Sequence, residues 1–167
     1  LRRVAELADR YATGVGHVTT RQDIQLHFVE LKDVPSIMRG LAEVGLTTRE
    51  ACANTVRNVT ACHLAGVCRG EVFDVTPYAK TVAYHLLRNP LNQSLPRKFK
   101  IGFAYEGENT VDIYSNDLGF VPHFDGARLD GFTVLAFAVL LSAAPAGPAS
   151  AAFLPVFSGC VRLDPSR

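Results

Sequence analysis

The hydrophobic and polar positions in the first third of the chain predict a helix, a strand and a second helix. In residues 1–11, apolar side chains recur at helical spacing, with Arg and Asp on the opposite face. From residue 17 to residue 31, apolar and polar side chains alternate, which predicts one strand with a polar face and a face packed on a core. Residues 33–45 return to helical spacing, and Pro35 suits the first turn of a helix as Gly45 suits its end.

After residue 45 the pattern predicts further helical segments, followed by strands. Residues 54–64 change from polar to apolar and predict a short helix. Thr76 as N-cap and Pro77 as first residue predict a strong helix that ends before Pro90. The expected strands are residues 98–104, 116–122 and 131–141. This order predicts an α+β fold, in which helices pack on a mixed or antiparallel sheet.

Charge changes the picture of the last part of the chain. The 167 residues include 17 Lys and Arg and 16 Asp and Glu, yet residues 131–161 contain none of them. A near-neutral balance disfavours a globally basic nucleic-acid binder, so no nucleic-acid partner is expected. The apolar run at residues 132–144 is shorter than the roughly 20 residues of a membrane span. We therefore expect no membrane partner, a buried strand or helix in that run, and little structure in the Ala- and Pro-rich residues 143–167.

Four cysteines, at positions 52, 62, 68 and 160, bear on redox state and metal binding. The charged N-terminus has no apolar leader behind it, so reduced thiols in a cytoplasmic protein are expected. The pair Cys62 and Cys68 has a spacing suggestive of a metal or cluster site, but no second Cys or His pair completes it. Two interpretations remain, a metal-binding pair and buried free thiols, and no residue is assigned as a metal ligand.

Three segments concentrate cationic and amide side chains. They are the polar face of the predicted strand (Thr19, Arg21, Gln25 and His27), the pair Arg57 and Asn58, and the pair Lys98 and Lys100. On a strand Lys98 and Lys100 share a face, where like charges repel. An anionic ligand explains such a pair, and exposed lysines that protect an edge strand are the alternative. The residues alone thus predict either a site for a multi-anionic ligand or a guarded sheet edge.

Together these segments resemble the siroheme-dependent sulfite and nitrite reductases. The matching stretches are HVTTRQDIQLH at residues 17–27, TVRNVTACHLAGVC at 55–68 and LPRKFKIGF at 95–103, in the order and spacing of that family. The resemblance covers residues 1–134 and implies the first half of a two-fold-repeated reductase fold.

On this basis the chain is expected to divide into three parts. Residues 1–31 would be the end of a ferredoxin-like half-domain that leads into the siroheme-facing strand. Residues 32–134 would be the α+β region that binds siroheme and substrate. Residues 135–167 would be an atypical apolar tail, for which a truncated or frame-shifted reading frame is the expected explanation.

The resemblance also implies which residues hold the cofactor. Thr19, Arg21 and Gln25 match the strand that holds siroheme carboxylates in the family, and His27 and Asn58 lie beside these positions. Siroheme is a polycarboxylate, so a wall of cationic and amide donors suits it. A [4Fe-4S] cluster is expected in the full-length protein, because family members deliver electrons through one, but its cysteine ligands are not expected in this chain.

For the reaction, the resemblance implies catalytic roles for Arg57, Lys98 and Lys100. They match residues that surround the substrate oxyanion, stabilise negative charge and relay protons. Lys100 and His27 are typical of sulfite-type members, so the expected reaction is the six-electron reduction of sulfite to sulfide by electrons from ferredoxin or a flavoprotein. Reduction of nitrite to ammonia is the alternative within the family. A non-catalytic half-domain that binds a tetrapyrrole or anion, and a fragment that binds nothing, are the alternatives outside it.

Overall fold

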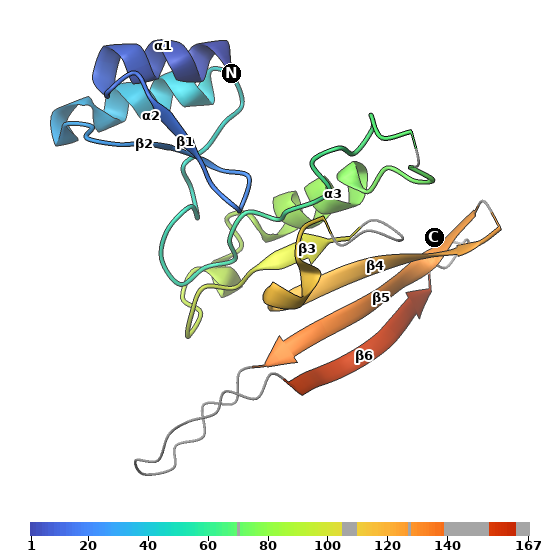
Figure 1. Cartoon of the computed structure of the whole chain (residues 1–167). Helices are drawn as coiled ribbons and strands as arrows, with labels where there is room; N and C mark the ends of the chain where they lie inside the picture. The colour runs from blue at the N-terminus through green and yellow to red at the C-terminus, as the bar shows by residue number, and fades with distance from the viewer. Residues whose placement is uncertain (70, 105–109, 127, 139–153, 163–167) are drawn as a thin grey trace, which may run out of the picture. The chain divides into compact units, whose positions relative to one another are not determined.

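The computed structural model describes residues 1–69, 71–104, 110–126, 128–138 and 154–162, with the backbone alone from residue 137 onward. Its contacts divide the chain into two compact units, Leu1–Cys52 and Ala53–Arg167, and each is described by itself below. Both units combine helices with strands, which confirms the α+β fold predicted from the sequence (Figure 1). The three-part division stays a prediction; in the structure, residues 34–42 pack within the first unit.

Unit 1 contains two helices and a hairpin. Its elements are α1 (Arg2–Tyr11), β1 (Gly16–Val18), β2 (Ile24–Leu26), the 3-10 helix η1 (Leu31–Asp33) and α2 (Val34–Ala42). Both helices agree with the predicted ones, and Gly45 ends the second with a left-handed φ of 75°.

The two helices of unit 1 pack on each other through a small apolar core. Its buried members are Val4, Leu7, Ala8 and Ile37. The helices approach closely at Gly40, where an added Cβ would lie 2.9 Å from Cδ2 of Leu7. Arg3 links the helices at the surface, because its Nη2 atom lies 2.6 Å from Oε2 of Glu43.

The strand expected over residues 17–31 is instead a hairpin. The Oγ1 atom of Thr19 accepts hydrogen bonds from the backbone N–H groups of Arg21 and Asp23, both at 3.2 Å. Gln22 adopts a left-handed φ of 59°, which reverses the chain. The single-strand prediction is therefore wrong, because a threonine side chain organises a turn that contains neither Gly nor Pro.

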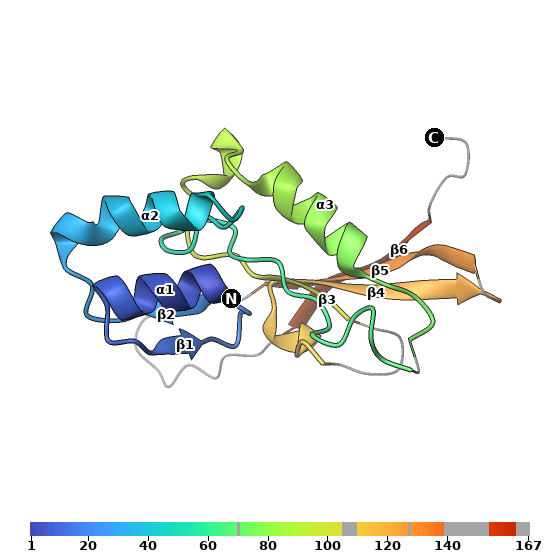
Figure 2. The same cartoon turned by 90° about the horizontal axis from the view of Figure 1, so that it is seen from above.

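Unit 2 is built on a four-stranded sheet in the order β3-β4-β5-β6. The strands are β3 (Ile101–Phe103), β4 (Leu118–Asp125), β5 (Arg128–Ala138) and β6 (Leu154–Arg162), with short 3-10 helices η2 (Pro90–Asn92) and η3 (Ile113–Ser115). β3 and β4 are parallel and the other pairs antiparallel. The helix α3 (Thr76–Leu86) covers one face of this sheet (Figure 2).

Two further sequence-based predictions for unit 2 are wrong. Residues 54–64 contain no helix, because Val56 and Thr60 form parallel bridges with Phe99 and Gly102 and the segment ends in a turn. Within the apolar tail, residues 154–162 form β6 against β5, where little structure was expected. Residues 139–153 and 163–167, also part of the expected tail, lie outside the described residues.

The core of unit 2 is aromatic and lies between α3 and the sheet. Its buried members are Val56, Val75, Ala79, Ile101, Phe103 and Phe132. The ring of Phe103 stacks on that of Phe120, with centroids 4.5 Å apart, and meets Phe132 edge-on. Thr76 is not the N-cap of α3; Asp74 fixes this end, since its Oδ1 accepts the backbone N–H of Thr76 at 2.8 Å. Within the described residues no helix is long and apolar enough to cross a membrane.

Candidate functional site

Backbone pairing brings the three predicted catalytic residues together in unit 2. Phe99 donates its backbone N–H to the carbonyl of Thr55 at 3.0 Å, and Arg57 donates its own to the carbonyl of Phe99 at 2.8 Å. This parallel pairing sets Arg57 level with Lys100 and places Lys98 one position before Phe99. Because side chains alternate along extended backbone, these three cations share the face opposite Val56 and Phe99. We call Arg57, Lys98 and Lys100 the cationic wall.

The neighbouring apolar residues explain why this face is polar. Val56 is buried, and Phe99 packs against the aromatic core. Because that face packs on the core, the opposite face carries the charged side chains. Lys98 is exposed, and Arg57 and Lys100 are half-buried. The local fold therefore orients the wall through burial of its apolar neighbours.

Asp117 anchors the backbone of Lys100. Its Oδ2 atom accepts the backbone N–H of Lys100 at 2.8 Å. In return, the N–H groups of Asp117 and Leu118 both donate to the carbonyl of Lys100 at 3.0 Å. The position of Lys100 at the start of β3 is thus fixed on both sides, which is the preorganisation that a charge-binding site needs.

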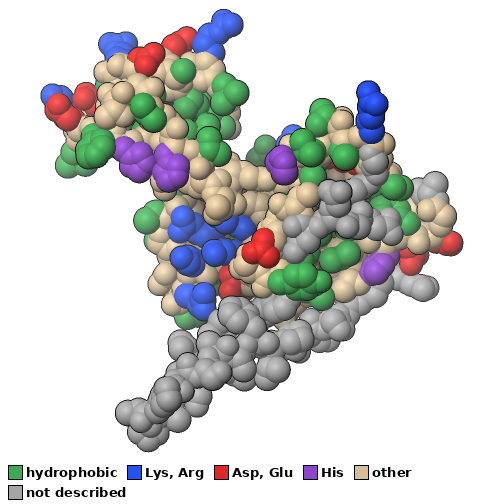
Figure 3. Space-filling model, viewed as in Figure 1, with side chains coloured by type: hydrophobic (Ala, Val, Ile, Leu, Met, Phe, Trp, Pro, Cys, Tyr) green, Lys and Arg blue, Asp and Glu red, His purple; other side chains and the backbone are tan. Residues whose placement is uncertain are grey.

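The two lysines of the cationic wall are not neutralised by carboxylates of the described residues. Among the described residues, neither the Lys98 nor the Lys100 ammonium forms an ion pair with a carboxylate. Figure 3 shows Lys and Arg side chains gathered on the visible face beside the segment that leads into β3. Like charges on one face without carboxylate partners attract an anion.

The candidate cofactor residues lie mainly on the hairpin of unit 1. Gln25 pairs with His17 across the two strands and is exposed. His27 follows β2, and its ring stacks on that of His17 with centroids 5.6 Å apart. Gln25, His17 and His27 therefore form one polar side of the hairpin, as alternation predicted, although Val18 on the other side is 71% exposed rather than packed on a core.

Thr19 and Arg21 lie in the turn of this hairpin rather than on a strand face. The Thr19 oxygen accepts two backbone N–H groups of the turn, and its hydroxyl hydrogen is still able to donate. Arg21 is half-buried. Asn58, the fifth candidate cofactor residue, is exposed in unit 2 beside Arg57. The structure thus groups four of the five candidates in unit 1 and the cationic wall with Asn58 in unit 2.

The cysteines do not form a metal centre in the part of the chain that the structure describes. Cys52 and Cys68 are exposed, Cys62 is half-buried, and none of these three described cysteines forms a disulfide. Cys62 and Cys68 lie in a turn-rich loop, in which Cys68 donates its backbone N–H to the carbonyl of Leu64 at 3.1 Å. No group of three or more His, Cys, Asp and Glu side chains converges in the described ranges. A cluster with four thiolate ligands does not fit these residues.

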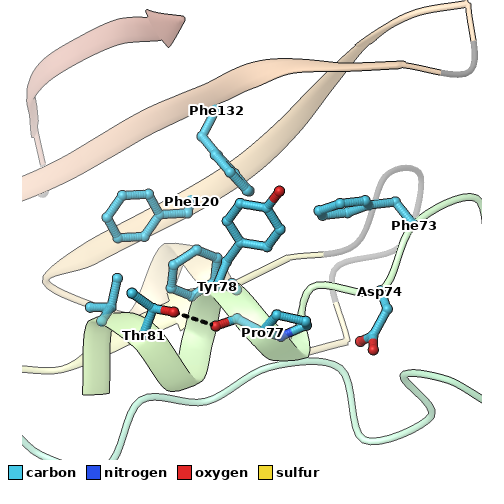
Figure 4. A pocket seen from close by; sticks show the side chains of 9 residues that line it. Phe73, Asp74, Pro77, Tyr78, Thr81, Phe120 and Phe132 are labelled. Atoms are coloured by element: carbon cyan, nitrogen blue, oxygen red, sulfur yellow. Dashed lines mark hydrogen bonds between the residues drawn. The ribbon is translucent and has the colours of Figure 1, made fainter. Parts of the chain in front are cut away.

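An aromatic cavity of about 650 Å³ opens between α3 and the sheet of unit 2 (Figure 4). It is lined by Phe73, Asp74, Pro77, Tyr78, Thr81, Val82, Phe103, Phe120 and Phe132. Thr81 donates its hydroxyl to the carbonyl of Pro77, so this polar group of the lining is already bonded. None of the candidate site residues lines the cavity, which is therefore separate from the cationic wall.

Two residues of the site were not anticipated from the sequence. His17 pairs with His27, and the only sign of it in the sequence was its place on the polar side of the alternating stretch. Asp117 acts across 17 positions of sequence, and no local pattern connects it with Lys100.

Comparisons with protein families match almost the whole chain. Residues 1–44 match the model described as "Nitrite/Sulfite reductase ferredoxin-like half domain". Residues 52–155 match the model described as "Nitrite and sulphite reductase 4Fe-4S domain". This second match continues past residue 134, where the resemblance in sequence was expected to end.

Individual relatives include enzymes of both kinds. The chain is 37% identical to the assimilatory ferredoxin-dependent nitrite reductase of Haloferax mediterranei, over 80% of this chain and 25% of the relative. It is 35% identical to the sulfite reductase [NADPH] hemoprotein beta-component of Oceanobacillus iheyensis, over 77% of this chain and 26% of the relative. The chain thus spans about a quarter of the length of the curated relatives that it matches.

Solved structures agree with the fold. The Mycobacterium tuberculosis NirA protein aligns with a TM-score of 0.73 and 30% identity, over 81% of this chain and 24% of that one. Dissimilatory sulfite reductase I aligns with a TM-score of 0.63 and 15% identity, over 74% of this chain and 29% of that one, which shows likeness of fold alone. The two matched models, together with this fold, show that the chain belongs to the nitrite and sulfite reductase family.

Proposed function

We propose that this chain is the part of a siroheme-dependent sulfite reductase that binds the substrate oxyanion and the carboxylates of siroheme. The observation that carries the proposal is the cationic wall, in which backbone pairing holds Arg57, Lys98 and Lys100 on one face. Three cations with no carboxylate bound to either lysine ammonium in the described residues form a site for a small, highly charged anion.

The proposed siroheme-binding residues fit the chemistry of that cofactor. Thr19, Arg21, Gln25 and Asn58 supply hydroxyl, guanidinium and amide donors, which are the groups that carboxylates accept from. His27 supplies a ring nitrogen on the same side of the hairpin as Gln25. When bound, siroheme would supply the iron that holds the substrate and passes electrons to it.

Within this proposal the wall residues have distinct tasks. Arginine presents a planar set of N–H donors, so the part of Arg57 is to hold the negative charge of the oxyanion through paired hydrogen bonds. The ammonium groups of Lys98 and Lys100 donate hydrogen bonds and pass protons to oxygen atoms that leave as water. Asp117 keeps Lys100 in place by binding its backbone, without a direct part in proton transfer.

Sulfite is the proposed substrate, and nitrite is the alternative. The second lysine of the pair, Lys100, and His27 are typical of sulfite-type members of the family. The nitrite alternative is supported by the relatives, since two of them are named nitrite reductases. Ferredoxin or a flavoprotein is the proposed electron donor, since relatives are named as ferredoxin-dependent or NADPH enzymes.

The proposal is tested with a chimera in which residues 1–134 replace the matching part of a related reductase. The chimera is purified from cells that make siroheme, its visible absorption is recorded, and methyl viologen drives reduction of sulfite and nitrite. We expect siroheme absorption and faster turnover of sulfite. Faster nitrite turnover would select the alternative substrate, and siroheme without turnover of either anion would favour a non-catalytic tetrapyrrole-binding module.

A further inference from the structure

β6 forms an outer edge of the sheet of unit 2. It pairs with β5 on one side, and among the described residues no strand pairs with its other side (Figure 1). The register shifts between Ala136 and Phe137, close to Pro155 of β6. From residue 157 to residue 162 the pairing with β5 is regular, so this part of β6 presents an uninterrupted backbone edge.

This edge lacks the features that usually prevent strands from pairing with another chain. Charged side chains, prolines and bulges protect most exposed edges. Residues 157–161 contain no charged residue and no proline, and the register shift of β6 precedes them. The match to the reductase family model ends at residue 155, so this edge lies beyond the matched residues.

Backbone hydrogen bonds elsewhere in the sheet show which groups of β6 point outward. The carbonyl of Phe120 in β4 accepts the N–H of Ala104 at 2.9 Å, so Phe120 directs its backbone groups away from β5. Its partner on β5, Val134, therefore directs its own backbone groups toward β6, where it is paired with Gly159. Because this direction alternates along a strand, residues 157, 159 and 161 face β5, and residues 158, 160 and 162 face outward.

We propose that two copies of this chain associate through antiparallel pairing of their β6 edges. A two-fold axis at residue 160 sets it opposite residue 160 of the second copy, and sets residue 158 opposite residue 162. Each outward N–H and C=O group then has a partner, and the two four-stranded sheets become one continuous sheet. This inference does not rest on the reductase function, because it uses only the backbone of unit 2.

The edge is complementary to itself, which favours a second copy as its occupant. Residues 157–161 carry no charge that would repel its own image across the two-fold axis, and Arg162 lies opposite residue 158 rather than opposite another Arg162. At the other side of the sheet, Val56 and Thr60 already form bridges alongside β3. Association through β6 therefore closes at two copies instead of continuing into a fibre.

The test is the mass of the purified 167-residue chain, measured by sedimentation equilibrium over a range of concentrations. A reductant is present throughout, so that disulfide-linked copies do not form. We expect the mass to rise with concentration from 18.1 kDa toward twice that value. A mass that stays at 18.1 kDa at every concentration would overturn the proposal.

Hydrogen exchange shows whether β6 is the edge that pairs. In the concentrated sample, the amides of residues 158, 160 and 162 should exchange more slowly than in the dilute one. The amides of residues 159 and 161 should be protected in both samples, because they face β5. A dimer in which the three outward amides exchange as they do in the monomer would contradict pairing through this edge.

Two substitutions at position 160 test the register of the pairing. Cys160→Lys and Cys160→Glu each place like charges opposite each other at the two-fold axis, so each variant alone is expected to remain monomeric. An equal mixture of the two should dimerise again, because opposite charges then meet. Leu91→Lys, at an 84% exposed position of η2, is the matched control for an added charge and should dimerise like the parent chain.

Circular dichroism verifies that each variant is folded. If folded Cys160→Lys dimerises as strongly as the parent chain, or if the mixture of the Lys and Glu variants stays monomeric, pairing about residue 160 is excluded.

Discussion

At the scale of single residues, the proposed work of the cationic wall is tested by removing its two ammonium groups. Lys98→Met together with Lys100→Met keeps most of the length of both side chains but removes their charge and their transferable protons. In the chimera, we expect sulfite turnover to fall by about 10²–10³-fold, as when donors to a developing negative charge are removed. Steady-state kinetics with methyl viologen measure the fall, and visible absorption measures the siroheme content.

The siroheme content should stay near that of the parent chimera, because neither lysine is assigned to the cofactor. Lys80→Met on the exposed side of α3 is the control for loss of a charge and should leave turnover unchanged. A double variant that loses siroheme, while its remaining holoenzyme turns over normally, would show that these lysines serve the cofactor instead.

Asp117 offers a second test at this scale, because it holds Lys100 by the backbone alone. Asp117→Ala removes the acceptor of the Lys100 N–H and is expected to cost about 1 kcal/mol in the free energy of unfolding. Asp117→Asn retains a side-chain oxygen and should recover most of this loss. Denaturant unfolding measures the cost, and hydrogen exchange of the Lys100 amide reports the bond. Equal exchange of that amide in both variants would argue against the anchoring role.

At the scale of elements, Gly119 controls how closely η3 approaches β4. A Cβ at position 119 would collide with the side chain of Ile113, which is fully buried. We expect Gly119→Ala to destabilise unit 2 by about 1–3 kcal/mol, as overpacking of a filled core does. The measurement is equilibrium unfolding in denaturant.

Shortening the side chain of Ile113, which a Cβ at position 119 would hit, provides the control for the cost of Gly119→Ala. Ile113→Val should relieve part of the cost of Gly119→Ala in a double-mutant cycle, because the two positions touch. Gly16→Ala in β1 should be nearly neutral, since its Cβ would lie at an ordinary 3.4 Å from Ile24. Strict additivity of the Gly119 and Ile113 changes would contradict a direct clash.

The start of α3 predicts a dependence of stability on pH. The pKa of the Asp74 carboxyl lies below its ordinary value of 3.8, because the side chain and backbone of Thr76 hydrogen-bond to it. The ionised Asp74 therefore contributes its full amount to the free energy of unfolding above its unfolded-state pKa. This contribution is lost as the pH falls through the lower folded-state pKa. Asp74→Asn cannot titrate, so its stability relative to the parent chain should rise only below about pH 4. A constant difference from pH 7 to pH 2 in denaturant unfolding would exclude this role.

Local signals were sufficient for the helices and insufficient for elements that depend on distant partners. Spacing and Pro or Gly positions identified α1, α2 and α3 because these signals act within a few residues. The segment at 54–64 was misread as a helix, since its conformation is set by bridges to Phe99 and Gly102, some 40 positions away. For the same reason the strand at 154–162, which pairs with β5, was not expected.

The candidate site also combines features that the sequence predicts with features that depend on distant residues. Motif resemblance located Arg57, Lys98 and Lys100, and alternation alone placed the two lysines on one face. The level pairing of Arg57 with Lys100 and the anchor from Asp117 needed the structure, because both join segments that are far apart in sequence. The pairing of His17 with His27 also depends on the turn at Thr19, because the two histidines would be far apart on a single straight strand.

At the scale of the whole molecule, the two units have hydrophobic cores of unequal size. Unit 2 buries a cluster of aromatic and aliphatic side chains around Phe103 and Phe132. Unit 1 has a smaller core, and it leaves Phe28 86% and Leu31 88% exposed. A unit of about 50 residues buries a small share of its surface and is only marginally stable. Unit 1 should therefore open more readily than unit 2.

Native-state hydrogen exchange tests this difference. The amides of α1 and α2 are expected to show lower free energies of opening than those of β3, β4 and β5, because protection follows the stability of each cooperative unit. Leu7→Ala, in the small core of unit 1, should lower protection in α1 and α2, by up to about 2–5 kcal/mol where the opening is complete. Protection of β4 should change far less, since Leu7 belongs to the other unit. If Leu7→Ala lowered protection in β4 as much as in α1, the chain would unfold as one cooperative body, and the division into two units would not describe its energetics.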